Sequence, residues 1–252
     1  MLTTITLILT TFVAVIVGVL IGAIGIGGVL LVPTLTYILG LGIHVAIATA
    51  MFTYLFSGAV GALEYARQDS IRWSMALWLC LGGMPGAYLG AAMTWVTPGV
   101  ILEGLIGLLV LLSGLQALRG PSGAADSVAS LSPLPLVVIG VVTGFGSSIT
   151  GTGGPLVLIP ILIWMQVPIL TAVGLSQVIQ IPIALLATTG NLMFGRIEWL
   201  IGFGVAVLLM LGVIVGARIA HRVSRVTLKR FIAVALLLVG TSMLVRTITT
   251  LV

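Results

Sequence analysis

The sequence predicts an all-α polytopic membrane protein made of two inverted-topology repeats of about five segments each, with the first pair of segments in each repeat broken or short. Three observations lead to this prediction. Hydrophobic residues make up 60% of the 252-residue chain and charged residues only 6%. The charges gather in a few narrow places, and glycines and tryptophans recur at a constant spacing of half the chain. Together these features describe a duplicated chain that lies in a lipid bilayer.

Charged residues are too few to cover the surface of a soluble fold, which ordinarily has roughly 25% of them. No formal charge occurs from Met1 to Leu63 or from Ser127 to Gly195. An Arg, Lys or Asp at the centre of a spanning helix costs roughly 2.5–3.5 kcal/mol on insertion scales. Long charge-free stretches are therefore what a membrane-spanning chain requires. We interpret the N-terminal residues as the start of the first spanning helix, not as a cleaved leader.

The formal net charge of +5 does not indicate a nucleic-acid partner. Most of it comes from one cluster between two apolar runs, formed by Arg218, Arg222, Arg225, Lys229 and Arg230. Such a cluster is typical of a cytoplasmic loop, because cytoplasmic loops carry an excess of Lys and Arg. No basic stripe alternates with aromatic residues, as a nucleic-acid surface would require.

Breaks at glycine, proline and charge divide the chain into two series of segments, since a spanning helix needs about 20 apolar residues. We expect an N-terminal repeat over residues 1–118, with segments near 4–24, 29–40, 43–66, 72–94 and 99–118. A linker with the composition of a flexible loop follows at 119–133. We expect a C-terminal repeat over residues 134–252, with segments near 134–150, 155–167, 169–193, 198–219 and 228–250.

The two series superpose at an offset of 126 residues. Gly25 matches Gly151, since 151 − 25 = 126, and Trp73 matches Trp199 at the same offset. Further pairs at this offset are Gly18 with Gly144, Gly27 with Gly153, Gly28 with Gly154, Gly86 with Gly212, Gly90 with Gly216 and Gly114 with Gly240. Apolar residues match by chance, but glycines and tryptophans in constant register do not. The chain is therefore a duplication.

The distribution of charge predicts that the two repeats are inverted. The loop from Thr94 to Gly99 carries no charge, whereas its counterpart holds the basic cluster. Conversely, the loop with Arg67 and Arg72 is more basic than its counterpart with Arg196 and Glu198. An odd number of segments per copy produces such an inversion. We expect both termini outside and a cytoplasmic linker.

Two glycine-rich breaks are the sharpest local feature. Each follows a long apolar segment and precedes a segment of only about twelve residues, which is too short to span comfortably. The candidate substrate-binding residues here are Gly25, Gly27, Gly28, Gly151, Thr152, Gly153 and Gly154. Clustered glycines permit positive φ and unwind a helix, and unwound backbone survives at membrane depth only if it is buried in protein or lines a cavity. Secondary carriers use pairs of broken helices in this way, and amides at a helix start attract anions.

Close helix packing is the alternative explanation for glycines in membranes. We prefer it for Gly18, Gly86, Gly90, Gly212 and Gly216, which recur at helical spacing within long segments. For the two breaks we prefer a binding site, because both are clustered, duplicated and followed by short segments. Polar residues nearby complete the candidate site: Gln177, Gln180, Tyr54, Thr53 and Ser148. Bonds between helices explain any one of these polar residues equally well.

Residues for catalysis are missing. No Asp, Glu, Lys or Arg lies in the middle of a segment, and no spacing of His and Glu suits a metal ion. No nucleophile elbow or phosphate-binding loop is present. The single cysteine, Cys80, excludes a cysteine metal cage and an intramolecular disulfide. We therefore expect no enzyme activity, no cofactor and no metal.

The duplicated Gly-x-Gly-Gly…Pro element, the 126-residue repeat and the tryptophans that open the fourth segments resemble the TauE/SafE sulfite-exporter family over essentially the whole chain. The resemblance implies a bacterial cytoplasmic-membrane carrier of small anions, often sulfur-containing or organic. Val29 and Pro155 stand where the typical family pattern has a third consecutive glycine. Cargo varies within such families, so the resemblance does not fix the substrate.

These observations favour a secondary carrier, an exporter or facilitator, for a small organic or sulfur-containing anion or a small polar solute. The solute would bind near mid-membrane between the two breaks, in a multi-pass protein of the inner membrane. The expected partners are this small molecule and the lipid bilayer, with a homodimer left open. Two alternatives are a passive channel, which would show conductance or unsaturable flux, and a non-transporting membrane subunit.

Overall fold

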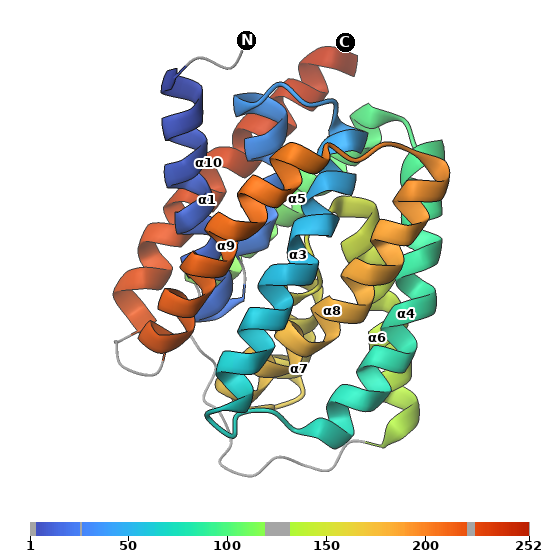
Figure 1. The fold of residues 1–252 in the computed structure, drawn as a ribbon, viewed down its shortest axis with the longest axis vertical. Coiled ribbons are helices and arrows are strands. Elements are labelled where there is room, and N and C mark those ends of the chain that lie inside the picture. The colour runs from blue at the N-terminus through green and yellow to red at the C-terminus, as the bar shows by residue number, and fades with distance from the viewer. Residues whose placement is uncertain (1–3, 26, 119–131, 221–224, 252) are drawn as a thin grey trace.

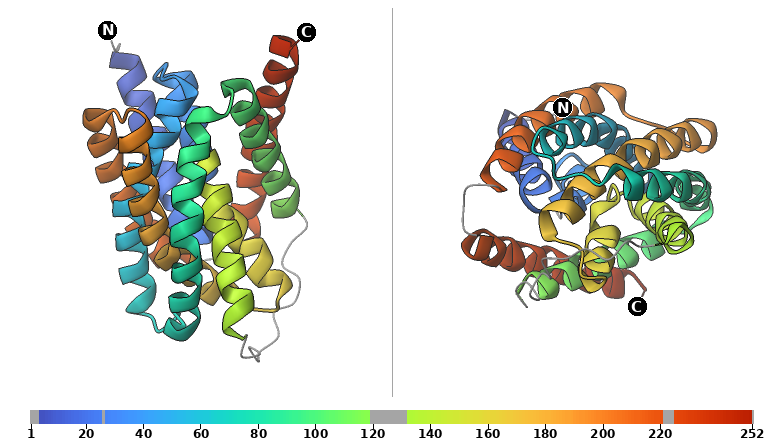
Figure 2. Two further views of the ribbon diagram at one scale, coloured as in Figure 1. Left: turned by 90° about the vertical axis from the view of Figure 1, so that its right-hand side faces the viewer. Right: turned by 90° about the horizontal axis from the view of Figure 1, so that it is seen from below.

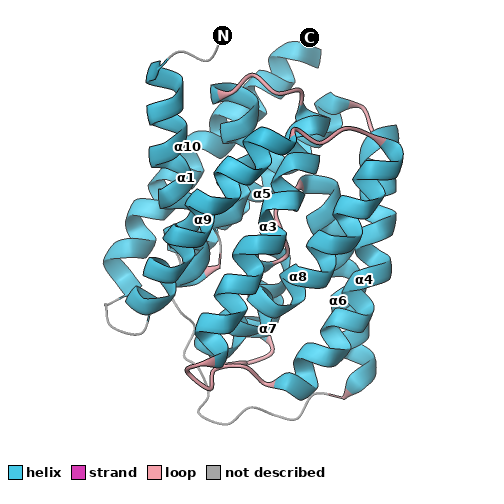
Figure 3. Cartoon of the chain, viewed as in Figure 1, coloured by secondary structure: helices cyan, strands magenta, loops and turns pink. Residues whose placement is uncertain are grey.

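Helices form nearly all of the computed structural model, which describes residues 4–25, 27–118, 132–220 and 225–251. Figure 3 shows only helices and connecting loops in this part of the chain. The first half contains α1 (Thr4–Ile24), a short segment of three pieces, α3 (Ile43–Ala66), α4 (Trp73–Val96) and α5 (Gly99–Leu118). The second half contains α6 (Pro133–Thr150), α7 (Pro155–Trp164), α8 (Ile169–Phe194), α9 (Trp199–Ala220) and α10 (Arg225–Leu251). The all-α fold class is confirmed.

The short segment in the first half changes helix type along its length. It begins with η1, a 3₁₀ turn over Gly27–Leu30, continues as α2 (Leu31–Pro33) and ends as η2, a π-helical turn over Thr34–Ile38. Its counterpart α7 is a regular α-helix of 10 residues. Both segments are too short to cross a bilayer alone, since a span needs about 20 residues.

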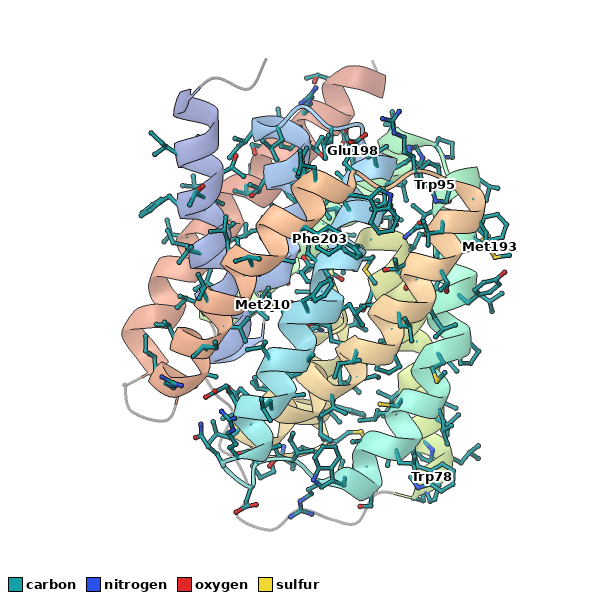
Figure 4. The ribbon with its side chains drawn as sticks, viewed as in Figure 1. Trp78, Trp95, Met193, Glu198, Phe203 and Met210 are labelled. Atoms are coloured by element: carbon teal, nitrogen blue, oxygen red, sulfur yellow. The ribbon has the colours of Figure 1, made fainter. Side chains whose placement is uncertain are left out.

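Within the described residues, five helices are long and apolar enough to cross a membrane: α3, α4, α6, α8 and α9. Tryptophans near both ends of α4 fit this placement. Figure 4 shows Trp78 near one end of the bundle and Trp95 near the other. Their separation of 17 residues (95 − 78) corresponds to about 25 Å of helix. Tryptophan favours the two membrane–water interfaces, and the hydrocarbon core between them is about 30 Å thick. The protein is therefore a multi-pass membrane protein.

The helices of one half pack mainly against helices of the other half. The main pairs are α4 with α6, α1 with α9, α3 with α8 and α5 with α10. The fourth helix of each half thus packs on the first helix of the other half. Figure 2 shows α5 and α10 crossing as a pair along one side of the bundle.

Glycines allow close contact between these helix pairs, and equivalent glycines do so in both halves. A Cβ on Gly86 of α4 would collide with the carbonyl oxygen of Val141, and one on Gly212 of α9 would collide with that of Val15. Both partners are related by the repeat offset, since 212 − 86 = 126 and 141 − 15 = 126. These glycines let two backbones approach closely. The prediction that Gly18, Gly86, Gly90, Gly212 and Gly216 serve helix packing is confirmed.

The first helices of the two halves run in opposite directions along the bundle. Figure 1 shows α1 starting at the end where both termini lie, whereas α6 starts at the other end. The chain therefore descends through α1 and ascends through α6. The sidedness of these ends in the membrane stays a prediction, and most of the linker and the basic side chains from Arg222 to Arg230 lie outside the described residues.

Candidate functional site

Both glycine clusters interrupt the helical chain where the sequence predicts. In the first half, α1 ends at Ile24 and helical structure resumes at Gly27, with Gly25 at φ 76°. In the second half, α6 ends at Thr150 and α7 begins at Pro155. Three glycines between them have positive φ: Gly151 (66°), Gly153 (81°) and Gly154 (113°). Residues with a Cβ rarely adopt such φ values. The glycines therefore determine where the helices are interrupted.

The two breaks lie against each other inside the bundle. A Cβ on Gly28 would lie 2.8 Å from the carbonyl oxygen of Thr152. One on Gly25 would lie 3.3 Å from the Cβ of Pro155, at the start of α7. Gly28 and Thr152 are both buried. Interrupted main chain from one half therefore contacts interrupted main chain from the other.

Tyr54 places this contact at the middle of the bundle. It lies halfway along α3, is fully buried, and donates a hydrogen bond from its hydroxyl to the carbonyl oxygen of Gly28 at 2.5 Å. Its ring also faces the second break, because a Cβ on Gly153 would lie 2.8 Å from the ring. One side chain thus touches both breaks.

The two candidate glutamines of α8 join the site to α3 and α1. Gln180 donates from Nε2 to the carbonyl oxygen of Tyr54 at 3.0 Å and to the hydroxyl of Ser57 at 3.1 Å. Gln177 donates from Nε2 to the carbonyl oxygen of Ile21 at 3.4 Å. Its Oε1 has no hydrogen-bond partner among the described residues. Both amides are buried and face glycines of α3.

The remaining candidates divide into residues at the breaks and residues beside them. The hydroxyl of Thr152 lies 3.1 Å from that of Thr150, and its amide donates to the carbonyl oxygen of Ser147 at 3.0 Å. Gly27 folds back onto α1. Ser148 is buried in the packing of α6 on α4. The hydroxyl of Thr53 donates to the carbonyl oxygen of Ala50 in its own helix at 2.7 Å. Among the described residues, neither side chain forms a hydrogen bond with a break.

Two side chains at the site were not among the sequence candidates. Tyr65 is fully buried and donates from its hydroxyl to the carbonyl oxygen of Gly22 at 2.9 Å, just before the first break. It follows Tyr54 by 11 residues, about three helical turns, so both tyrosines share one face of α3. The hydroxyl of Ser176 lies 3.4 Å from the position of a Cβ on Gly25. The spacing of the two tyrosines is the signal that could have identified Tyr65.

The electrostatics of the site come from the main chain. The short segment at Gly27 and α7 both start at the breaks and run toward opposite ends of the bundle (Figure 1). Each helix start carries roughly half a positive unit charge, so two partial positive charges face the middle. In the described part of the chain, no group of three or more His, Cys, Asp or Glu residues could hold a metal ion. The arrangement can attract an anion without a formal cation.

Comparison with known proteins gives one consistent result. A family model described as "Sulfite exporter TauE/SafE" matches residues 10–243. A "Probable membrane transporter protein" of Xylella fastidiosa (strain 9a5c) is 28% identical over 192 residues, covering 73% of this chain and 74% of the relative. The "Probable membrane transporter protein YdhB" of Bacillus subtilis is 28% identical over 221 residues, covering 84% and 89%. No solved structure matches the chain.

Proposed function

Because the chain belongs to the sulfite exporter TauE/SafE family and is a membrane transporter, we propose that it is a secondary carrier for a small organic or sulfur-containing anion. The anion binds near mid-membrane between the two glycine-rich breaks. The protein acts in the cytoplasmic membrane and needs no cofactor. Sulfite, named in the family description, is the first probe of this proposal.

The observation that carries the proposal is the contact between the two breaks. Gly28 of one break and Thr152 of the other approach each other beside Tyr54, at the middle of α3. Packing of helices alone requires small residues but no interruption of the helix. Paired interruptions at this depth are typical of carriers, in which they provide main-chain groups for the solute.

Helix dipoles bind an anion weakly enough for a carrier to release it on the other side of the membrane. Two helix starts hold an anion by partial charges, each roughly half a unit. A buried arginine or lysine would bind the same anion more tightly and release it more slowly. The described ion pairs lie at the ends of the helices and not at the breaks. They join Glu64 with Arg67 and Arg218, and Arg196 with Glu198.

The helix contacts between the two halves are related by the repeat offset. The fourth helix of each half holds the first helix of the other, and the contacts of Gly86 and Gly212 are related by the repeat offset. We propose that the halves are inverted repeats and that rocking between them exposes the site to each side in turn.

The function is tested with Gly153→Leu in purified protein reconstituted into liposomes. Gly153 has a φ of 81° and lies against the ring of Tyr54, so a leucine at this position disrupts the break. We expect sulfite flux to fall to background while the protein still inserts. The matched control is Gly204→Leu on α9, where a Cβ would meet nothing within 4 Å.

Flux by wild-type protein must saturate with sulfite concentration, because a carrier binds its solute before each turnover. Unchanged flux in Gly153→Leu would contradict the site. Unsaturable flux, or single-channel conductance, would instead favour a passive channel.

A further inference from the structure

Two hydroxyl groups on one face of α6 lack hydrogen-bond partners. Thr143 and Ser147 are four residues apart and fully buried, and neither hydroxyl finds a partner among the described residues. The usual local solution is seen nearby, where the hydroxyl of Thr150 donates to the carbonyl oxygen of Gly146 at 2.6 Å. Folded proteins leave few buried polar groups unpaired, because each one is costly. Ser148 of α6 also has an unpaired buried hydroxyl, but it packs against Gly90 of α4, whereas Ser147 lies beside the start of α7.

The hydroxyl of Ser147 faces the start of α7. Its oxygen lies 4.0 Å from the position of a Cβ on Gly154, the residue before the helix. A Cβ there would make ordinary van der Waals contacts, with a methyl carbon of Ile183 at 3.6 Å and one of Ile179 at 3.9 Å. The glycine leaves the volume of this one carbon unfilled beside an unpaired hydroxyl.

The first turn of α7 offers a main-chain donor at the same place. The amides of Val157 and Leu158 donate to the carbonyl oxygen of Gly154, and Pro155 has no amide hydrogen. The amide of Leu156 donates to no carbonyl in the described part of the chain. No side chain caps this helix start. Free amides at an uncapped helix start attract oxyanions.

The first half has no such polar face. The counterparts of Thr143 and Ser147 are Val17 and Ile21, since 143 − 126 = 17 and 147 − 126 = 21. Both counterparts are buried apolar residues. The carbonyl of Gly28 in the first break already accepts a hydrogen bond from Tyr54. The two breaks are therefore chemically different, although they are equivalent in sequence.

From this asymmetry we infer that the hydroxyls of Thr143 and Ser147, together with the first turn of α7, form the subsite for the oxyanion group of the transported solute. This inference rests on the proposed function. Ser147 can supply a hydroxyl donor and Leu156 an amide donor to an acceptor oxygen, and the partial positive charge of α7 adds attraction. Ile179 and Ile183 of α8 form the apolar wall, which strengthens these bonds by excluding water. The rest of the solute lies toward the first break.

The test compares binding of sulfite and of sulfoacetate by purified full-length protein, measured by titration calorimetry. We expect Ser147→Ala to bind each anion at least about tenfold more weakly, since a hydrogen bond to a charged group is lost. Thr143→Val should show a similar loss. The matched control is Ser113→Ala, because that hydroxyl donates to the carbonyl oxygen of Leu109 in its own helix at 2.7 Å.

Thermal unfolding without ligand separates binding from structure. Removing an unpaired buried hydroxyl leaves no partner unsatisfied, so Ser147→Ala should unfold at the same or a higher temperature than wild type. If wild-type protein binds neither anion, the proposed function fails. If wild type binds and Ser147→Ala binds equally well, or loses stability along with affinity, only the assignment of this subsite is overturned.

Discussion

Tyr54 shows how one buried side chain connects the parts of the site. The sequence suggested that it contacts the solute or joins helices, and in the structure its hydroxyl donates to the carbonyl of Gly28. That carbonyl belongs to an interrupted helix, so it needs a partner from elsewhere in the fold. Tyr65 does the same for Gly22, within α1. The two tyrosines thus make the same kind of hydrogen bond, one at the first break (Tyr54) and one beside it (Tyr65). Comparing them isolates the role of the bond at the break.

Tyr54→Phe and Tyr65→Phe should therefore affect stability alike and transport differently. Each substitution removes one hydrogen bond to a buried carbonyl, at a net cost of about 0.5–1.5 kcal/mol. We expect both variants to unfold at a lower temperature than wild type in detergent. Sulfite flux in liposomes should fall severalfold only in Tyr54→Phe. Equal flux in the two variants would show that the bond to Gly28 has no special role.

The sequence was sufficient to locate the breaks but not the roles of individual polar residues around them. Three glycines among four residues cannot continue a helix cheaply, so the break at Gly151–Gly154 follows from local chemistry. The hydrogen bond of Tyr65 depends on where α3 packs against α1, which no local pattern specifies. The unpaired hydroxyl of Ser147 likewise depends on how α7 folds back beside α6. Such contacts arise only from the tertiary arrangement.

At the scale of elements, the sequence predicted the helices closely and their type less well. The predicted ranges 43–66 and 99–118 agree with α3 and α5. The short segment was expected near 29–40, yet it begins at Gly27 and changes from 3₁₀ to π geometry. Pro33 ends the α-helical piece of this segment. Its counterpart α7 begins with Pro155, which suits a first turn, and it stays regular although Pro160 lies inside it, so proline does not account for the difference.

Close packing of helices makes a sharp prediction for two glycines of α9. A Cβ on Gly212 would collide with the backbone of α1, whereas one on Gly204 would meet nothing within 4 Å. Gly212→Ala should lower the unfolding temperature in detergent markedly, because two backbones must separate. Gly204→Ala should leave it unchanged or raise it, since alanine favours helix by about 1 kcal/mol. Equal effects would contradict the packing of α9 on α1.

Across the whole molecule, the duplication predicted from sequence matches the starts of α3 and α8 and of α4 and α9. Ile43 of α3 and Ile169 of α8 differ by 126, as do Trp73 of α4 and Trp199 of α9. The exchange of packing partners extends this match to three dimensions. The inverted relation of the halves in the membrane stays a prediction, which the opposite directions of α1 and α6 support (Figure 2).

An ion pair ties the two halves together at the end away from the termini. Glu64 of α3 is buried, and its two carboxylate oxygens contact Arg67 at 3.3 Å and Arg218 of α9 at 3.5 Å. Of these two contacts of Glu64, the one with Arg218 joins the two halves, and the one with Arg67 lies within the first half. If rocking opens this end, Arg218→Ala should favour the open form. Arg67→Ala is the matched control, because the contact that it removes lies within one helix.

Access to the site from this end can be measured by thiol labelling. Ser57→Cys places a near-isosteric thiol beside Gln180 at the centre, and Cys80→Ala removes the only native cysteine. A membrane-impermeant thiol reagent is applied from the linker side to the Cys80→Ala/Ser57→Cys variant. We expect it to label residue 57 severalfold faster when Arg218→Ala is added to this variant. A rate that depends on Arg67 and not on Arg218 would contradict a closure between the halves.

The central claim is that an oxyanion binds where the two glycine breaks meet. Its most direct test is a crystal structure with selenite, the selenium analogue of sulfite, located by anomalous scattering. We expect a selenium peak in the bundle between Gly28 and the start of α7, near the hydroxyl of Ser147. A peak only at surface arginines such as Arg67 or Arg218, or no peak at a saturating selenite concentration, would contradict it.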